Sequence, residues 1–262
     1  MKTKTIYLLA LLLCIAAACK KDNPYTPIPP PEPVKKYLAK VLIAGTDSNF
    51  YEIERCTWDS LHRLKTYRSV AHAYVMDAEF YYDSIGRVYR VDYNAPSLGV
   101  SGLCFVFDWK NEKELNGIDI YMHNIFFDTT YYACRDTYLY DESSINIRIE
   151  RVYVKTNHTT ICQIEWDGLN ITSTKGPVQP CIDNQKFDDK YSPWSVFPDL
   201  FIAGLAGDMN SVPLYNPSKN NPIEGNDRKY EYEYDEDGYP IHQYYIREDD
   251  TKDLLYIFEY YN

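Results

Sequence analysis

Polar and apolar residues alternate with a period of two along most of the chain, a pattern that predicts β-strands. In YEYEYDEDGYP, residues 230–240, tyrosines occupy one side of the alternation and acids the other, until a glycine and a proline interrupt it. The same alternation runs through AEFYYDSIGRVYRVDY, residues 78–93, and DLLYIFEYYN, residues 253–262. The last of these is expected to close as a strand against the hairpin of residues 230–247. With 27 tyrosines and 10 phenylalanines, composition also favours strands.

The polar end of YEYEYDEDGYP is predicted to turn the chain. Asp235 followed by Gly238 suits a type I turn, in which Asp caps the backbone and Gly takes a left-handed conformation. The alternative is a calcium loop. An EF-hand alignment that begins at Glu233 places Tyr244 at the twelfth position, where a bidentate Glu is required. The alignment therefore argues against calcium.

Related aromatic and aspartate pairs recur along the chain at spacings of 24, 25, 33 and 26 residues. Two short strands with their turns occupy about this length, so each unit is predicted to be one hairpin. The fold class expected is all-β: an antiparallel meander of repeated hairpins, forming a curved sheet or a partly closed barrel. The aspartates of these units are Asp59, Asp83, Asp108, Asp141 and Asp167.

The alternation lapses between Thr172 and Asp227, where seven prolines interrupt the chain. One short helix is expected from about Pro198 to Gly204, within an otherwise irregular segment.

The N-terminus has the pattern of an export signal. Lys2 and Lys4 precede an apolar run, residues 6–18, that is too short to span a bilayer. Ala16-Ala17-Ala18-Cys19 resembles the lipobox of bacterial lipoproteins, and this resemblance implies that Cys19 becomes the lipidated first residue of the mature chain. We therefore expect a signal peptide over residues 1–18 and attachment to a membrane through lipid chains.

Proline makes up six of the fifteen residues at 20–34, which predicts an extended spacer instead of a core. Residues 19–34 are thus expected to be a lipidated tether and residues 35–262 a single all-β domain. Export as an outer-membrane lipoprotein leaves both the periplasmic and the cell-surface face open.

Charge and cysteine content narrow the function classes. The formal net charge is −11, and loss of Lys2 and Lys4 with the signal makes it −13. Nucleic acid binding is not expected, because phosphates require clustered Lys and Arg. Beyond Cys19 the exported chain has five cysteines, which could form the bridges Cys162–Cys181 or Cys104–Cys134 or remain buried thiols: Cys56, Cys104, Cys134, Cys162 and Cys181.

The sequence contains no H-E-x-x-H, phosphate-binding loop or nucleophile elbow. We therefore expect no enzyme, no cofactor and no metal site. The tryptophans offer the best candidates for binding. Trp58 and Trp166 precede turn aspartates and are expected to be framework. Trp109 follows Asp108 inside a polar turn, and Trp194 lies in the irregular segment; each is a candidate platform for a sugar ring or protein partner, or else a plug at the end of the sheet.

Three short segments resemble the D-[ST]-hydrophobic/Thr acceptor of O-glycosylation found in Bacteroidota. They are Asp59-Ser60-Leu61, Asp83-Ser84-Ile85 and Asp128-Thr129-Thr130. The first two lie at predicted turns, where the same residues also fit ordinary turn chemistry.

The aromatic-Asp-x-x-Gly cores at Asp83 and Asp235 resemble the YD repeat of Rhs-type proteins. The whole plan is similar to a family of Bacteroidota lipoproteins of unassigned activity: lipobox, proline tether, tyrosine-rich hairpins, a W-D-G segment at Trp166, and a closing YEYDEDGYP. The resemblance supports fold and location. The function expected is a non-catalytic envelope lipoprotein that binds a glycan or a protein partner. The alternatives are a structural or assembly component without a small ligand and, third, a glycan-active enzyme.

Overall fold

The structure, a computed structural model, describes residues 36–45, 49–71, 74–95, 100–111, 114–124, 129–141, 146–167, 170–176, 185–193 and 218–261. The chain divides into two compact units, residues 1–34 and 35–262. All described strands belong to the second unit.

Within the described ranges, sixteen strands form one sheet in which every pair is antiparallel. Their bounds are β1 Tyr37–Ala44, β2 Phe50–Trp58, β3 Leu64–Ala71, β4 Tyr74–Tyr82, β5 Val88–Ala95, β6 Val100–Trp109, β7 Leu115–Asn124, β8 Thr129–Tyr140, β9 Asn146–Tyr153, β10 His158–Trp166, β11 Ile171–Lys175, β12 Lys186–Tyr191, β13 Asn220–Gly225, β14 Arg228–Tyr234, β15 Pro240–Ile246 and β16 Lys252–Tyr261.

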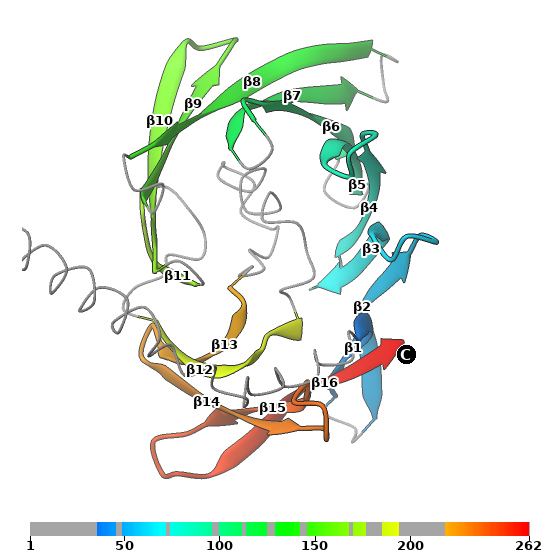
Figure 1. Cartoon of the computed structure of the whole chain (residues 1–262), viewed down its shortest axis with the longest axis vertical. Coiled ribbons are helices and arrows are strands. Elements are labelled where there is room, and N and C mark those ends of the chain that lie inside the picture. The colour runs from blue at the N-terminus through cyan, green and yellow to red at the C-terminus, as the bar shows by residue number, and fades with distance from the viewer. Residues whose placement is uncertain are drawn as a thin grey trace, which may run out of the picture. The chain divides into compact units, whose positions relative to one another are not determined.

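The sheet is a meander whose first and last strands pair with each other. Its order runs from β11 down to β1, continues with β16 and ends at β12, so the two edges are consecutive in sequence. The sheet curves into a partly closed barrel (Figure 1). Across the seam between the edges, Gln185 N donates to Thr172 O at 3.4 Å, and Asn220 N donates to Asn170 Oδ1 at 3.0 Å. The predicted all-β meander is confirmed, and so is the pairing of the last strand with β15.

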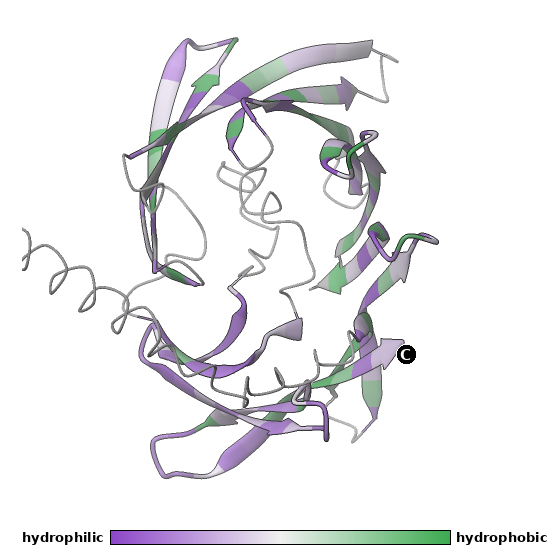
Figure 2. Ribbon diagram, in the orientation of Figure 1, coloured by the Kyte–Doolittle hydropathy of each residue, from purple (hydrophilic) through white to green (hydrophobic). Residues whose placement is uncertain are grey.

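Successive side chains of a strand point to opposite sides, which gives this sheet a buried face and a charged face. Bands of both hydropathy classes follow one another along individual strands (Figure 2). One row of the buried face crosses β2 to β6 through residues that are all at most 5% exposed: Cys56, Tyr67, Ala78, Tyr93 and Leu103. The residues between them form the charged face, including Arg55, Arg68, Asp77 and Asp92.

The turns predicted at Asp59, Asp83 and Asp235 are present, and they share one bonding pattern. In the turn at Asp235, the N–H of Gly238 donates to Asp235 O at 3.1 Å, and Asp235 N donates to Tyr239 O. The Asp235 carboxylate also accepts the N–H groups of Asp237 and Tyr239. Gly238 has φ +83°, as a left-handed turn position requires. The turn interpretation of YEYEYDEDGYP is therefore confirmed.

Asp59 and Asp83 repeat this pattern, with His62 and Gly86 at the left-handed position. The prediction for Asp108 is wrong. Asp108 lies within β6, and the turn follows later, with Lys110 N donating to Glu114 O. Asn111 takes over the capping role, because its Oδ1 accepts the N–H of Glu114 at 2.8 Å.

A second repeated feature is an aromatic residue at the end of β2, β4, β6 and β8. Its polar atom bonds to the backbone near the start of the preceding strand and so ties the two adjacent strands together. The bonds are Trp58 Nε1 to Leu38 O at 2.9 Å, Tyr82 OH to Leu64 O at 2.7 Å, Trp109 Nε1 to Val88 O at 2.8 Å, and Leu115 N to Tyr140 OH at 2.9 Å.

Several expectations fall on other parts of the chain. The helix expected from Pro198 to Gly204 lies outside the described residues. Within the described ranges, no helix is long and apolar enough to cross a membrane. Cys104 and Cys134 are free thiols, so the bridge considered between them is not formed; Cys181 lies outside the described residues.

Candidate functional site

A groove crosses the charged face over strands β2 to β8. Its cavity volume is about 940 Å³, within the usual range for small-molecule sites. Most lining side chains belong to the charged face, and the remaining ones come from the row of buried residues beneath it. The lining consists of Arg55, Thr57, Thr66, Tyr67, Arg68, Asp77, Ala78, Glu79, Arg90, Asp92, Tyr93, Asn94, Gly102, Leu103, Cys104, Val106, Tyr121, His123 and Thr130.

Two like-charged pairs face each other across strands in the groove. Arg55 lies opposite Arg68, and Glu79 lies opposite Asp92. Directly opposed like charges destabilise an antiparallel sheet. Departures from local stability rules concentrate at functional sites, so both pairs mark the groove as a candidate site.

Neighbouring counter-charges hold these groups in place. Arg90 donates to both carboxylate oxygens of Asp92 at 2.7 Å. Arg55 binds Glu52 in the same two-pronged manner, at 2.8 and 2.6 Å. The hydrogen bonds from Arg55 hold the pKa of Glu52 below its usual value, even though partial burial acts in the opposite direction.

The remaining charges of the groove are held more loosely. Arg68 lies 3.6 Å from Asp77, and both side chains are about half exposed. The lining contains three arginines and three carboxylates, so its formal charge balances.

Tyrosine rings lie beside the groove at two places. Tyr81 is covered by the Arg90 guanidinium, 5.5 Å from the ring centre. Its hydrogen bond to the Glu79 carboxylate, with a smaller contribution from burial, raises the pKa of Tyr81 to about 12. On the other side, the ring of Tyr121 lies 5.3 Å from that of Tyr132, which is 37% exposed.

The groove therefore offers hydrogen-bond donors, acceptors and aromatic edges within one open surface. Glu79 and Asp92 are both bonded to neighbouring donors, an arrangement that suits holding a ligand better than moving a proton. Among the described residues, no cluster of three or more His, Cys, Asp or Glu side chains could hold a metal ion.

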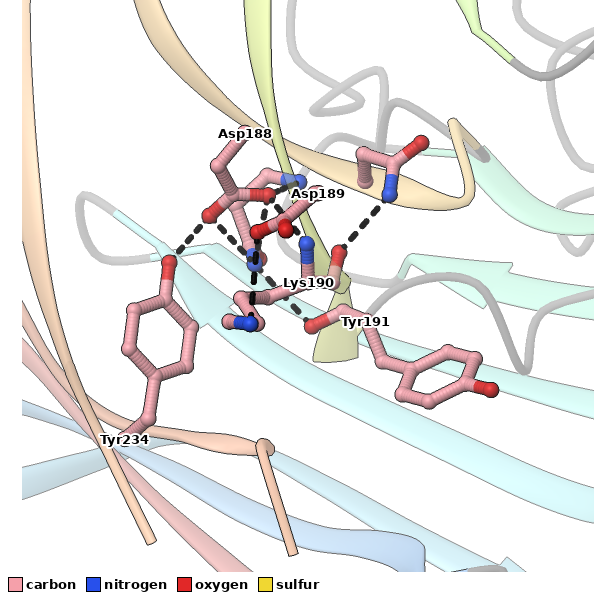
Figure 3. Close-up of polar contacts among 7 residues, drawn as sticks. Asp188, Asp189, Lys190, Tyr191 and Tyr234 are labelled. Atoms are coloured by element: carbon pink, nitrogen blue, oxygen red, sulfur yellow. Dashed lines mark hydrogen bonds and ion pairs between the residues drawn. The ribbon is translucent and has the colours of Figure 1, made fainter. Parts of the chain in front are cut away.

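A second polar cluster secures the β12 edge (Figure 3). Asp188 on β12 accepts the backbone N–H groups of Lys190 and Asn221, each at 3.0 Å. It also accepts the Tyr234 hydroxyl and the Asn221 side-chain amide. Burial, followed by the bond to Asp188, raises the pKa of Tyr234. With its oxygens committed to these donors, Asp188 serves as a joint between β12, β13 and β14.

The structure gives Trp109 a defined place. Its side chain is partly buried against the core, donates to Val88 O, and lies under the Arg87 guanidinium at 5.3 Å. Trp109 is also absent from the groove lining. These contacts fit the alternative considered for it, a plug at the end of the sheet, and a part in ligand binding stays a prediction. Cys19 and Trp194 lie outside the described residues.

The suggested glycosylation segments lie partly at exposed turns. Ser60 and Ser84 are exposed residues within their turns, whereas Asp128 lies outside the described residues. Thr130 is a groove residue that shares a hydrogen bond of 3.1 Å with His123.

Sequence reasoning missed the groove residues. Their one visible signal is charge at alternate positions, as in Arg90 and Asp92 or Asp77 and Glu79. Alternation shows that such residues share a face, but it does not show which strands lie together.

No family model matches the chain, and no curated protein matches it. Solved structures that resemble it loosely include two porin-like proteins. A porin-like protein from Bacteroides vulgatus ATCC 8482 has a TM-score of 0.40 and 9% identity, covering 87% of this chain and 99% of that one. A porin-like protein from Bacteroides uniformis ATCC 8492 has a TM-score of 0.36 and 12% identity, covering 86% and 98%. At these scores the likeness supports no inference about this chain.

Proposed function

We propose that this protein is a non-catalytic binding protein of the bacterial outer membrane, anchored through a lipidated Cys19, and that it holds an oligosaccharide in the groove of the charged face. The observation that carries the proposal is the pair of like-charged cross-strand contacts, Arg55 with Arg68 and Glu79 with Asp92.

Sugar hydroxyl groups satisfy both kinds of pair, because each hydroxyl donates one hydrogen bond and accepts others. The carboxylates would accept from hydroxyls, and the guanidinium groups would donate to them. The balanced charge of the lining favours a ligand without strong net charge. Tyr81 and Tyr121 supply aromatic surface of the kind on which the apolar faces of sugars pack.

The binding experiment compares Glu79→Gln with Glu150→Gln on a glycan array and by calorimetry with the best oligosaccharide found. Glu150 is a matched control because it lies on β9, pairs with Arg148 at 2.6 Å, and is outside the groove. Glu79→Gln removes a charge-assisted hydrogen bond of about 1.5–3 kcal/mol, so affinity should fall about tenfold or more. Glu150→Gln should bind normally.

The melting temperature of Glu79→Gln provides an independent test of the groove. Glu79→Gln removes the repulsion with Asp92, so its melting temperature should be unchanged or slightly higher while binding falls. If Glu79→Gln binds as well as the native chain, the groove is not the site. If no oligosaccharide binds at all, the structural-component alternative leads.

The anchor is tested separately. Cys19→Ser should move the chain from the membrane fraction to the soluble fraction, because two or more acyl chains on Cys19 supply the attachment. Retention of this variant in membranes would remove the lipoprotein assignment.

A further inference from the structure

Two hairpin turns place aliphatic side chains at their tips. Leu61 is 68% exposed and Ile85 is 62% exposed, the highest values for large apolar residues in the part of the chain that the structure describes. Each follows the turn aspartate by two positions, in the turns Asp59–Arg63 and Asp83–Arg87. Their backbone N–H groups bond to those aspartates, so turn closure does not require apolar side chains.

Two other turns with the same bonding have a polar residue at this position. Asp237 takes it in the turn that begins at Asp235, and Asp249 takes it in the turn that begins at Arg247. Short polar residues are also the usual choice for such positions. A polar residue therefore closes the same turn, and the bonds of the turn do not account for the apolar side chains of Leu61 and Ile85.

Charge is neutralised around the two apolar tips. Arg63 pairs with Asp59 at 2.7 Å, and Arg87 pairs with Asp83 at 2.8 Å. At the other end of the strands, the β15–β16 turn presents Glu248, Asp249 and Asp250, all exposed. The rim with the apolar tips also carries the turn that begins at Asp235, in which Asp235 and Asp237 pair with Lys36 and Glu236 is exposed. The apolar tips and the start of the folded unit thus share one rim, and the β15–β16 turn lies at the other.

The tether joins the folded unit at the rim with the apolar tips. Lys36 immediately precedes β1, and the ring of Tyr37 stacks on His62 of the first turn at 4.8 Å. The Lys36 ammonium pairs with Asp235 at 2.8 Å and with Asp237 at 2.7 Å. The chain that precedes Lys36 contains Cys19, so the expected lipid anchor connects to this rim.

We propose that the tips of the turns Asp59–Arg63 and Asp83–Arg87 rest on the lipid surface, with Leu61 and Ile85 inserted among the acyl chains. This inference rests on the lipid anchor of the proposed function. Insertion removes exposed apolar surface from water. The anchor keeps the rim at high local concentration beside the bilayer, so two small contacts are enough to orient the domain.

The test places a tryptophan at each tip of the acylated full-length protein: Leu61→Trp or Ile85→Trp. The control, Asp249→Trp, changes the same turn position on the opposite rim. Each protein is reconstituted into phosphatidylethanolamine–phosphatidylglycerol vesicles, with and without brominated acyl chains, which quench indole fluorescence on contact. Flotation of the vesicles first establishes attachment.

The added emission at positions 61 and 85 should be quenched by brominated lipid, and that at position 249 should not. Flotation with equal or absent quenching at all three positions would overturn the docking proposal and leave the anchor intact. Failure to float would overturn the anchor and the docking together. Sedimentation velocity of the Cys19→Ser chain tests the other possible occupant, a second copy of the protein. If this chain forms a dimer and Leu61→Asp dissociates it, the tips contact a second copy and the proposal is overturned.

Discussion

The buried ion pair between Asp136 and Arg151 provides a quantitative test of the fold. The two residues lie directly opposite each other on β8 and β9, and the guanidinium donates to both carboxylate oxygens at 2.6 Å. Asp136 is 0% exposed and Arg151 is 6% exposed, on the face that otherwise forms the hydrophobic core. Neither charge could be hydrated if its partner were removed.

We expect Asp136→Asn to lower the free energy of unfolding by about 3–5 kcal/mol, because it leaves the Arg151 charge buried without a counter-ion. The double variant Asp136→Leu/Arg151→Met should lie within about 1–2 kcal/mol of the native chain, since apolar replacements of a buried pair are often nearly neutral. The coupling energy between the two positions should therefore be large.

Urea unfolding followed by circular dichroism measures these values, with the exposed pair Arg148–Glu150 on β9 as control. Glu150→Gln should cost less than about 1 kcal/mol, as is usual for surface ion pairs. A cost for Asp136→Asn as small as that of the control would refute burial of this pair.

Three further expectations follow from particular contacts. Trp109→Ala should lower the free energy of unfolding by about 3 kcal/mol without weakening oligosaccharide binding, because the indole packs on the core and bonds to Val88 O outside the groove. A normal melting temperature together with lost binding would instead identify Trp109 as a binding platform. Gly176→Ala should lower the free energy of unfolding in urea by more than about 3 kcal/mol, since Gly176 has φ +111° and an added Cβ would lie 2.4 Å from Ile161 O. Gly86→Ala, at φ +90° with open space around it, should lower it by only about 1 kcal/mol. Equal losses would contradict the close approach at Gly176. Burial raises the pKa of Glu54 well above its usual value, so the folded chain holds a proton that the unfolded chain releases, and the free energy of unfolding should fall as pH rises from the unfolded pKa of Glu54 toward the folded one. Glu54→Gln should flatten this fall in urea unfolding measured between acid and neutral pH. An unchanged pH profile would count against a buried neutral Glu54.

Local patterns were sufficient for the strands and for most turns. The bonds that close the turns at Asp59, Asp83 and Asp235 all fall within five consecutive residues, so the motif itself contains the interaction. At Asp108 the same motif misled, because Asn111 provides a competing cap three residues later. That shift moved Trp109 from an assumed turn position to the end of β6, where it joins the framework aromatics.

The groove depends on pairings that the sequence does not specify. Arg55 and Arg68 meet because β2 and β3 pair in one register, and a shift by one residue would place either side chain on the buried face. Alternation thus predicted which residues share a side of each strand. The like-charged contacts and the groove they line arise only when seven strands are set side by side.

The sequence by itself determined the class of fold, since period-two alternation and capped aspartate turns act over a few residues and need no distant partner. Tertiary structure alone decided that β1 pairs with β16 and that the seam falls between β11 and β12. Backbone hydrogen bonds join any two strands equally well, so the choice of neighbours comes from long-range packing, as where Val41 lies opposite Phe258 in the core. The same long-range pairing brings the start of the folded unit to the rim that carries Leu61.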